Sequence, residues 1–296
     1  MTTLRRNKLD LHTHTRRSDG VLEPRALYEQ MRAYGMRLVS VTDHDSLQGL
    51  RELHAAGLGV TAGEAGPRLL PGVEINTVGD EVYAGVGLGR DGAEIHVLGY
   101  GMRLDDADFD ATLARQRQGR RIRIELTLER LRALGMPVDD QLHALASDAL
   151  DAMGRPHVAR ALVAAGYASS VDDAFERWLE HGRPAYIRRQ GMGPREAIEA
   201  IGAAGGLPVL AHSPMAVEHA DVVGVLQGWG LRGLEVHYRS FDPATVARLA
   251  VFATQRGLLA TGGSDYHGDT MTYAEQQATT YVPDAVGERL LDALAA

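Results

Sequence analysis

The sequence predicts an α/β protein, in which strands of a parallel sheet or barrel alternate with helices and a small α-helical domain is inserted. Three observations predict this fold class. Short apolar segments alternate with helical patterns in the first hundred or so residues, the stretch from 105 to 192 is almost entirely helical in pattern, and the alternation returns after Gly193. We therefore expect a first barrel part at 1–104, a helical insertion at 105–192 and a second barrel part at 193–296.

Hydrophobic periodicity and turn residues define the individual elements. The first part is expected to contain strands at 8–14, 37–42, 69–74 and 94–100, helices at 24–34 and 49–56, and a hairpin or loop at 77–92. The insertion is expected to contain helices at 108–134, 141–146, 155–165 and 171–180. The last part is expected to contain helices at 194–204, 216–229, 243–256 and 284–294, and strands at 207–212, 233–237 and 259–262.

The composition excludes several classes of protein. Hydrophobic residues make up 45% of the 296 residues and charged residues 24%, which is typical of a globular chain rather than a disordered or fibrous one. The net charge of −8 argues against a protein that coats duplex DNA. Because cysteine is absent, any metal must be bound by nitrogen and oxygen atoms. The sequence shows neither a signal peptide nor a long apolar run, so we expect a cytoplasmic protein with no membrane partner.

Histidines and carboxylates stand at or just past the ends of the predicted strands. His12 and His14 alternate on an extended segment, so both side chains can point toward one ion. We expect the set to converge, because β/α barrels build their sites at the carboxyl ends of strands. A lone histidine is more often structural, but that explanation would have to recur at six strand ends. The nine expected metal ligands are His12, His14, Asp19, His44, Glu74, His96, His212, Asp265 and His267.

This ordered set resembles the PHP (polymerase and histidinol phosphatase) family of metal-dependent phosphoesterases. It is most similar to the bacterial branch that contains 3′,5′-nucleotide bisphosphate phosphatases and a 5′–3′ RNA exonuclease. The branch resemblance rests on Gly-Arg-Pro-His at 154–157 and Gly-Arg-Pro-Ala-Tyr at 182–186 in the insertion. The resemblance implies a distorted (β/α)7 barrel and two or three divalent ions, with Mn²⁺, Fe²⁺ and Zn²⁺ suited to such ligands.

The resemblance also implies how the ligands are shared. His12, His14, Glu74 and Asp265 would bind one ion, Glu74, His96 and His212 the second, and Asp19, His44 and His267 the third. A water that bridges two such ions loses a proton near neutral pH and attacks phosphorus. The expected catalytic residues are Glu74, which bridges two ions, together with His212, Asp265 and His267. Asp43 and Asp45 are expected to support the ligands or to cap the following helix.

The insertion carries the remaining positive charge and is expected to bind substrate. Arg155, His157 and Arg183 lie in the branch motifs and are the expected ligands of a substrate phosphate, although Arg155-Pro156 also suits the start of a helix. A cluster of five arginines has two interpretations, a solvated helix face or a face that binds phosphate or RNA, and the sequence favours neither. The five are Arg115, Arg117, Arg120, Arg121 and Arg123.

The expected function is hydrolysis of phosphate esters in 3′,5′-nucleotide bisphosphates or at the 5′ ends of short RNA. Histidinol-phosphate phosphatase is an alternative, because it is the other well-known activity of the family. A catalytically silent module that scaffolds a partner is a further alternative. The large insertion favours the nucleotide branch, and nine competent ligand positions argue against a silent module.

Overall fold

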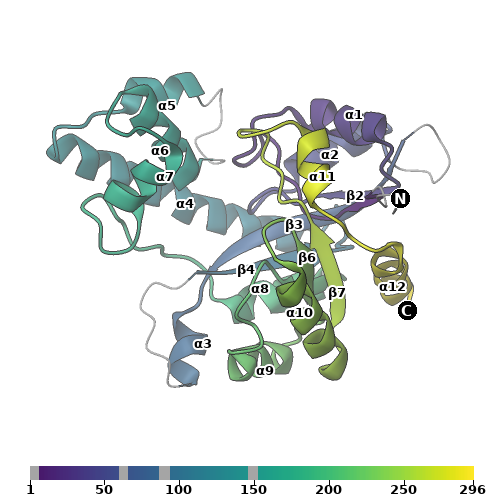
Figure 1. The fold of residues 1–296 in the computed structure, drawn as a ribbon. Coiled ribbons are helices and arrows are strands. Elements are labelled where there is room, and N and C mark those ends of the chain that lie inside the picture. Colours follow the sequence, from purple (N-terminus) through teal and green to yellow (C-terminus); the bar gives the residue numbers. More distant parts are fainter. Residues whose placement is uncertain (1–6, 60–65, 87–93, 146–152) are drawn as a thin grey trace.

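The computed structural model describes residues 7–59, 66–86, 94–145 and 153–296. One seven-stranded sheet has its strands in chain order, from β1 to β7. They span Leu9–Asp10, Leu38–Val41, Arg68–Val78, Glu94–Tyr100, Leu207–Leu210, Gly233–Tyr238 and Leu259–Gly263. Hydrogen bonds link the segment after β1 to the one after β7, for example from the Asp265 N–H to the His12 carbonyl at 2.7 Å. The sheet is therefore a nearly closed barrel, as expected (Figure 1).

The distortion of the barrel lies at β4. This strand is antiparallel to both β3 and β5, whereas every other neighbouring pair is parallel. β3 continues to Val78, four residues beyond the predicted end, and its long pairing with β4 sets Asn76 opposite His96. The start of β4 thus lies at the same end of the barrel as the carboxyl ends of the parallel strands.

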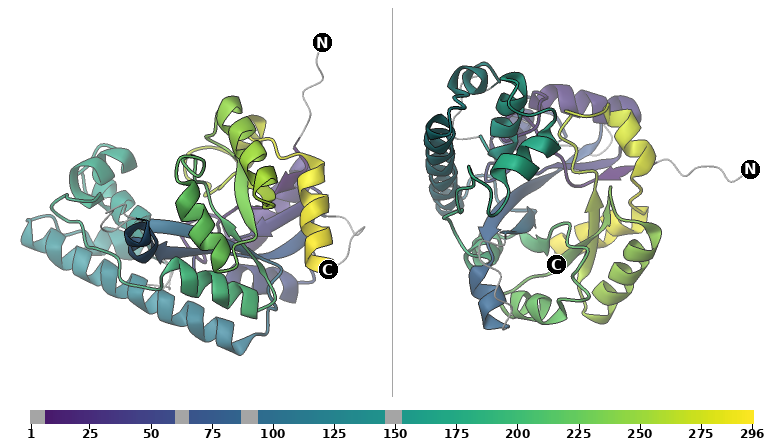
Figure 2. Two further views of the ribbon diagram at one scale, coloured as in Figure 1. Left: turned by 90° about the horizontal axis from the view of Figure 1, so that it is seen from below. Right: turned by 60° about the vertical axis from the view of Figure 1, so that its left-hand side comes forward.

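Helices surround the barrel (Figures 1 and 2). They are α1 (Pro24–Tyr34), α2 (Gln48–Ala55), α3 (Asp80–Gly85), α8 (Pro194–Ala203), α9 (Ala220–Gly228), α10 (Pro243–Gln255), α11 (Tyr273–Thr279) and α12 (Asp284–Ala295). The main core joins strand residues such as Val39 and Val73 to helix residues such as Leu27. A second cluster places Leu290 of α12 against Leu9 and other strand residues. Burial of these apolar surfaces holds the strands that carry the site.

The insertion is built on one long helix, α4 (Ala107–Ala133), which Asp106 caps by accepting a hydrogen bond from the Phe109 N–H. Phe109 packs in the barrel core, whereas Leu131 belongs to a separate hydrophobic cluster. That cluster includes Leu162 and the helices α5 (Asp139–Leu145), α6 (Arg155–Ala164) and α7 (Val171–Ala174), followed by a π-helix at Phe175–Leu179. α4 thus extends from the barrel into a second lobe (Figure 2).

The observed elements differ from the prediction in several details. The region expected to be a hairpin or loop contains α3, whose Val82 is fully buried, although part of it, 87–92, lies outside the described residues. Helix α11 was not predicted, although Thr272 and Glu275 form a capping box at its start. Helix α9 begins at Ala220 rather than at 216. No helix in the described ranges is long and apolar enough to span a bilayer.

Candidate metal centre

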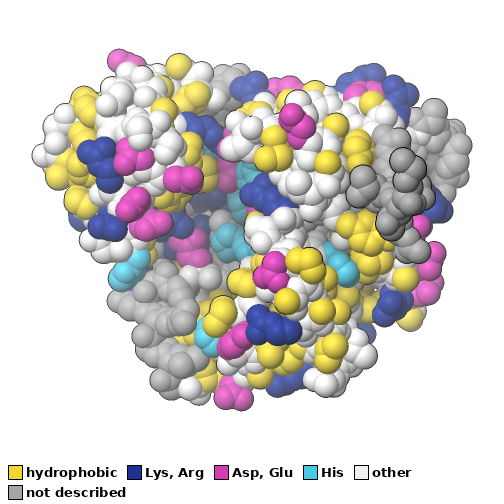
Figure 3. Space-filling view, viewed as in Figure 1, with side chains coloured by type: hydrophobic (Ala, Val, Ile, Leu, Met, Phe, Trp, Pro, Cys, Tyr) yellow, Lys and Arg dark blue, Asp and Glu magenta, His cyan; other side chains and the backbone are white. Residues whose placement is uncertain are grey.

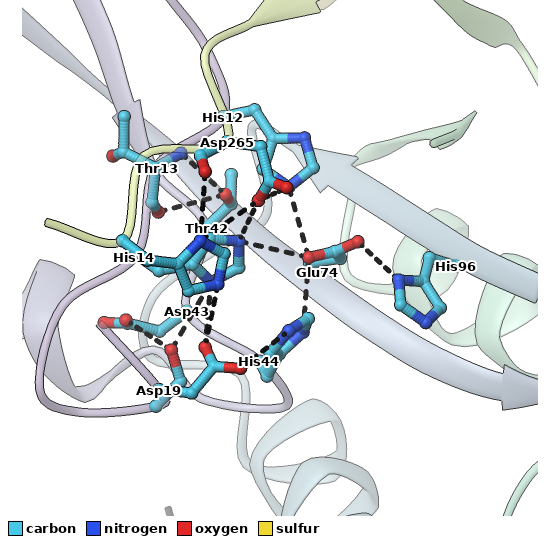
Figure 4. A network of polar contacts seen from close by, with 12 residues as sticks. His12, Thr13, His14, Asp19, Thr42, Asp43, His44, Glu74, His96 and Asp265 are labelled. Carbon is cyan, nitrogen blue, oxygen red and sulfur yellow. Dashed lines mark hydrogen bonds and ion pairs between the residues drawn. The ribbon is translucent and has the colours of Figure 1, made fainter. Parts of the chain in front are cut away.

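The nine predicted ligands meet at one end of the barrel. Figure 4 shows His12, His14, Asp19, His44, Glu74, His96 and Asp265 among them. Within each of three groups, one potential ligand atom per residue lies within 4.8 Å of the others. The groups are His12, His14, Glu74 and Asp265; Glu74, His96 and His212; and His14, Asp19, His44 and His267. They match the expected division, with His14 added to the third group. His96 stands near the start of β4, not at a strand's carboxyl end, but the antiparallel direction of β4 brings it to the site.

Glu74 lies between the groups. Its Oε2 is 3.1 Å from His12 Nε2, 3.2 Å from His14 Nε2 and 3.2 Å from His44 Nδ1. Its other oxygen, Oε1, is 2.8 Å from His96 Nδ1 and 3.0 Å from His212 Nε2. Each oxygen of one buried carboxylate therefore faces a different set of histidines, which is the arrangement of a bridging ligand.

The site concentrates negative charge. Burial would lower the pKa of His14, but contacts with Asp265 and Glu74 raise it to about 10. Burial likewise opposes the charge on His96, but Glu74 and Glu94 raise its pKa to about 9. The carboxylates thus stabilise positive charge on neighbouring groups, which a divalent cation supplies more strongly than a proton.

The donor set fits divalent cations. His14 Nε2, Asp19 Oδ1 and His44 Nδ1 are buried, and each lies 3.2 Å from a carboxylate oxygen or a ring nitrogen. None of the three makes a hydrogen bond of ordinary geometry among the described residues. Buried polar atoms are normally hydrogen-bonded, so these atoms call for a ligand. Imidazole nitrogen and carboxylate oxygen together suit Zn²⁺, Mn²⁺ and Fe²⁺. Cations held here would activate water and neutralise the charge on phosphate oxygens.

Side chains that were not predicted orient the ligands. The fully buried Glu235 of β6 accepts from His12 Nδ1 at 2.9 Å and from the His212 N–H at 2.8 Å. The Tyr238 hydroxyl donates to Asp265 Oδ2 at 2.8 Å. Such partners fix the orientation of metal ligands. One signal in the sequence could have identified Glu235. It is a carboxylate between two apolar residues on the predicted strand at 233–237, and consecutive strand residues point to opposite faces of the sheet.

Asp43 and Asp45 both support the site and neither caps a helix, because α2 begins after Leu47 without a side-chain cap. Asp43 accepts hydrogen bonds from the Thr15 N–H and hydroxyl, both at 2.7 Å. The fully buried Asp45 accepts from Arg120 Nη2 at 2.6 Å and from Arg189 Nη2 at 3.3 Å. Asp45 therefore connects the strand-end segment of His44 to the insertion.

Backbone strain also gathers at the site. Among the described residues, positive φ outside glycine occurs at Asp45 (54°), His212 (24°) and Asp265 (48°). Two of these are predicted ligands and the third follows one. Such conformations cost free energy and persist where the surrounding structure enforces them, typically at functional sites.

A pocket rich in arginine adjoins the metal groups. Its walls include Asp19, His44 and His96 on the barrel side, and Figure 3 shows histidine and charged side chains in the hollow between the two lobes. Four arginines line its insertion side, and we refer to it as the arginine pocket. They are Arg120, Arg123, Arg155 and Arg189.

The predicted phosphate ligands occupy different places. Arg155 lines the arginine pocket and also begins α6, so both interpretations of its motif hold. His157 is nearly buried, and its Nδ1 accepts from the Gly154 N–H at 3.2 Å. Burial lowers the pKa of His157 to about 4, so the ring is neutral at pH 7. Arg183 is exposed, follows the π-helix and is not part of the pocket wall.

The five arginines of α4 divide into two faces. Arg115 and Arg121 are exposed and contact Glu196 and Glu125 at the surface. Arg120 and Arg123 are buried, while Arg117 donates to the Asp45 carbonyl at 2.7 Å. A solvated face and an inward face thus coexist on one helix, since residues three apart share a side of a helix.

Comparison with known proteins is consistent with this geometry. The PHP domain family model matches residues 10–183. The chain is 32% identical over 280 residues to the 5′–3′ exoribonuclease Rnm of Escherichia coli (strain K12), covering 87% of this chain and 84% of that protein. It is 30% identical over 270 residues to a 3′,5′-nucleoside bisphosphate phosphatase of Chromobacterium violaceum, covering 88% and 87%.

Solved structures agree. A protein of Bifidobacterium adolescentis, assigned as a metal-dependent phosphoesterase, superposes with a TM-score of 0.79 at 30% identity, covering 97% of this chain and 96% of that one. A Chromobacterium violaceum protein described as an amidohydrolase, with bound sulfate and no metal, gives 0.80 at 28% identity with the same coverage. The sequence motifs, the barrel and these matches together show that the chain belongs to the PHP family of metal-dependent phosphoesterases.

Proposed function

We propose that this phosphoesterase hydrolyses a phosphate ester of a nucleotide that carries a second phosphate, with 3′,5′-nucleotide bisphosphates as the leading substrates and the 5′ ends of short RNA as the second class. The observation that carries the proposal is the position of the arginine pocket directly beside His44 and His96. One phosphate at the metal groups and another among guanidinium groups account for both features. The relatives named for bisphosphate and RNA hydrolysis support this substrate class.

We further propose two or three ions of Mn²⁺, Fe²⁺ or Zn²⁺, held by the nine ligands named above, with Glu74, His212, Asp265 and His267 catalytic. Glu74 would set the spacing between two ions, because its two oxygens face different histidines. Asp265 would be held in place by Tyr238, which donates to its Oδ2. Residues 105–192 would form the substrate-binding insertion.

The second phosphate would bind Arg155 together with Arg120, Arg123 and Arg189. Arg120 Nε, Arg123 Nη2 and Arg189 Nε are buried donors without a hydrogen-bond partner among the described residues. Burial, together with repulsion from the nearby guanidinium groups of Arg120 and Arg123, lowers the pKa of Arg189 to about 10. A phosphate dianion would relieve that repulsion and accept several charge-assisted hydrogen bonds. Arg183 and His157 remain proposed phosphate ligands, although they are not part of the wall of the arginine pocket.

The test compares two substrates on one set of variants. Manganese-loaded wild type, Arg155→Ala, Arg183→Ala and the surface control Arg115→Ala are assayed for phosphate release from adenosine 3′,5′-bisphosphate and from p-nitrophenyl phosphate. Arg155→Ala should lower kcat/KM about ten- to a hundredfold on the bisphosphate and little on the aryl phosphate, which lacks a second phosphate. The control should change neither.

Two outcomes contradict the proposal. Equal losses on both substrates would mean that Arg155 supports the fold or the reacting phosphate. A preference for histidinol phosphate over every nucleotide tested would establish the other activity. A loss for Arg183→Ala as large as that for Arg155→Ala would instead show that the exposed arginine reaches the substrate.

A further inference from the structure

The arginine pocket contains one acidic residue that the reaction does not require. Glu94 is the first residue of β4, and its Oε1 accepts from Arg123 Nη1 at 2.9 Å. Arg155 Nη2 donates to both carboxylate oxygens, at 3.1 and 3.0 Å. Glu94 therefore already holds the two guanidinium groups that a substrate phosphate would meet at this side of the pocket.

Two carboxylates divide the four arginines between them, and they differ in position. Asp45, which holds Arg120 and Arg189, is fully buried and does not line the pocket. Glu94 lines the arginine pocket and also a second pocket, which shares His96 with it and is lined by residues such as Tyr83 and His212. A ligand entering between the lobes thus contacts Glu94 but not Asp45.

Glu94 lies against two guanidinium groups, 2.9 Å from Arg123 Nη1 and 3.0 Å from Arg155 Nη2, and such neighbours favour the ionised form of a carboxyl group. An ionised carboxylate on a guanidinium group has the charge and hydrogen-bond geometry of a phosphate edge. The wall of the pocket carries four guanidinium groups and two carboxylates, those of Asp19 and Glu94. Positive charge is therefore in excess, and a dianion can still bind in competition with Glu94.

We propose that Glu94 is an internal competitor that weakens binding of the second phosphate at Arg123 and Arg155 and so speeds product release. This role of Glu94 rests on the proposed function in one respect, that the substrate carries a second phosphate. That phosphate does not react, so it stays on the product and holds the product as firmly as the substrate. The contacts of this phosphate are the same in the substrate, the transition state and the product, and such uniform binding lowers KM without raising kcat. A competing carboxylate limits it.

The test replaces Glu94 by the isosteric, neutral glutamine. Calorimetry on manganese-loaded protein measures the affinity for adenosine 5′-monophosphate, with adenosine as the reference that lacks a phosphate. Glu94→Gln should bind the monophosphate about tenfold more tightly than wild type, because the carboxylate no longer competes with the phosphate for about one charge-assisted contact. Adenosine affinity should not change. The control is Glu196→Gln, which removes an exposed carboxylate paired with Arg115 and should leave both affinities unaltered.

Two further measurements locate the effect. In the Arg155→Ala background the gain from Glu94→Gln should shrink to about threefold or less, because one of the arginines for which Glu94 competes is gone. In turnover, Glu94→Gln should lower KM and the product inhibition constant together and lower kcat. If Glu94 only orients the arginines, Glu94→Gln should show the reverse, a higher KM and weaker binding of the monophosphate.

Unchanged or weaker monophosphate binding by Glu94→Gln would overturn the proposal. If that variant does not fold, a crystal structure of the wild type with adenosine 5′-monophosphate decides. The phosphate should contact Arg123 or Arg155 with Glu94 displaced from it, and a phosphate bound elsewhere overturns the proposal. The proposed function is tested separately, because it fails if the wild type releases no phosphate from adenosine 3′,5′-bisphosphate. The calorimetric comparison of Glu94→Gln with wild type does not depend on turnover.

Discussion

The metal groups and the arginine pocket are neighbours with opposite electrostatics. On the barrel side, acidic neighbours raise the pKa of the buried His14 to about 10. On the insertion side, burial, together with nearby cations including Arg160 and Arg120, lowers the pKa of His157 to about 4. The first region therefore stabilises added positive charge, whereas the four guanidinium groups that line the arginine pocket favour an anion. A phosphate ester bound to divalent ions and carrying a second phosphate satisfies both.

The two regions are also built differently. Most side chains of the metal groups follow the carboxyl end of a strand, whereas Glu74 lies within β3 and His96 near the start of β4. Backbone hydrogen bonds of the barrel bring these strands together. The arginine pocket needs side chains from α4, from the start of α6 and from the segment before α8. It also depends on Asp45, which holds Arg120 and Arg189 from the barrel side. One region depends on sheet register and the other on contacts between lobes.

The largest expected effect comes from a substitution that changes only the metal groups. Glu74→Gln keeps the size of the side chain but removes the charge that faces five histidine nitrogens. Metal catalysis supplies several kcal/mol, so kcat should fall at least about a thousandfold. Phosphate release and metal content by mass spectrometry measure the loss. Thermal unfolding should show a folded variant, and near-normal turnover would exclude the bridging role.

The metal groups and the arginine pocket also differ in how much of each could be predicted from the sequence. The proximity of the nine predicted ligands could be inferred from the sequence because a β/α barrel places the carboxyl ends of its parallel strands at one rim, so order along the chain implies proximity. Glu74 was identified although β3 continues beyond it to Val78. The reversed direction of β4 was not predicted, because an alternating pattern does not encode strand direction. His96 was therefore assigned to the site for a partly wrong reason.

The arginine pocket could be predicted only in part. Spacing on α4 shows that Arg120 and Arg123 share a face, but not which face meets the barrel. Arg189 had no motif, since its role arises from a contact with Asp45, 144 residues away in the chain. Arg183 stood in a motif yet is exposed. Contacts between distant segments carry the information that local patterns lack.

The next largest effect removes the connection between the regions. Asp45→Asn leaves the buried Arg120 and Arg189 without their carboxylate. Breaking a buried ion pair by removing one partner costs about 3–5 kcal/mol, because a buried charge becomes uncompensated. We expect the free energy of unfolding in urea to fall by about that amount. The control Asp110→Asn, which breaks the partly exposed pair with Arg51, should cost about 1 kcal/mol or less. Equal costs would refute a buried connection at Asp45.

The smallest expected effect is a change in pH dependence that tests the lowered histidine pKa on the insertion side. His157 has a pKa of about 4 in the folded chain and an ordinary value of 6.5. Between these pH values the unfolded chain binds more protons, so acidification favours unfolding, and the stability is lost as pH falls from about 6.5 toward 4. From pH 7 to 5 this contributes at most about 2 kcal/mol. His157→Gln should remove that part of the slope and keep the bond from the Gly154 N–H, because glutamine suits this position of a capping box. Urea unfolding at both pH values, at constant manganese, compares the variant with wild type and with the exposed control His143→Gln. A variant that loses as much stability as wild type on acidification would show that His157 is not held neutral, and the contrast with His14 would then not extend to the insertion.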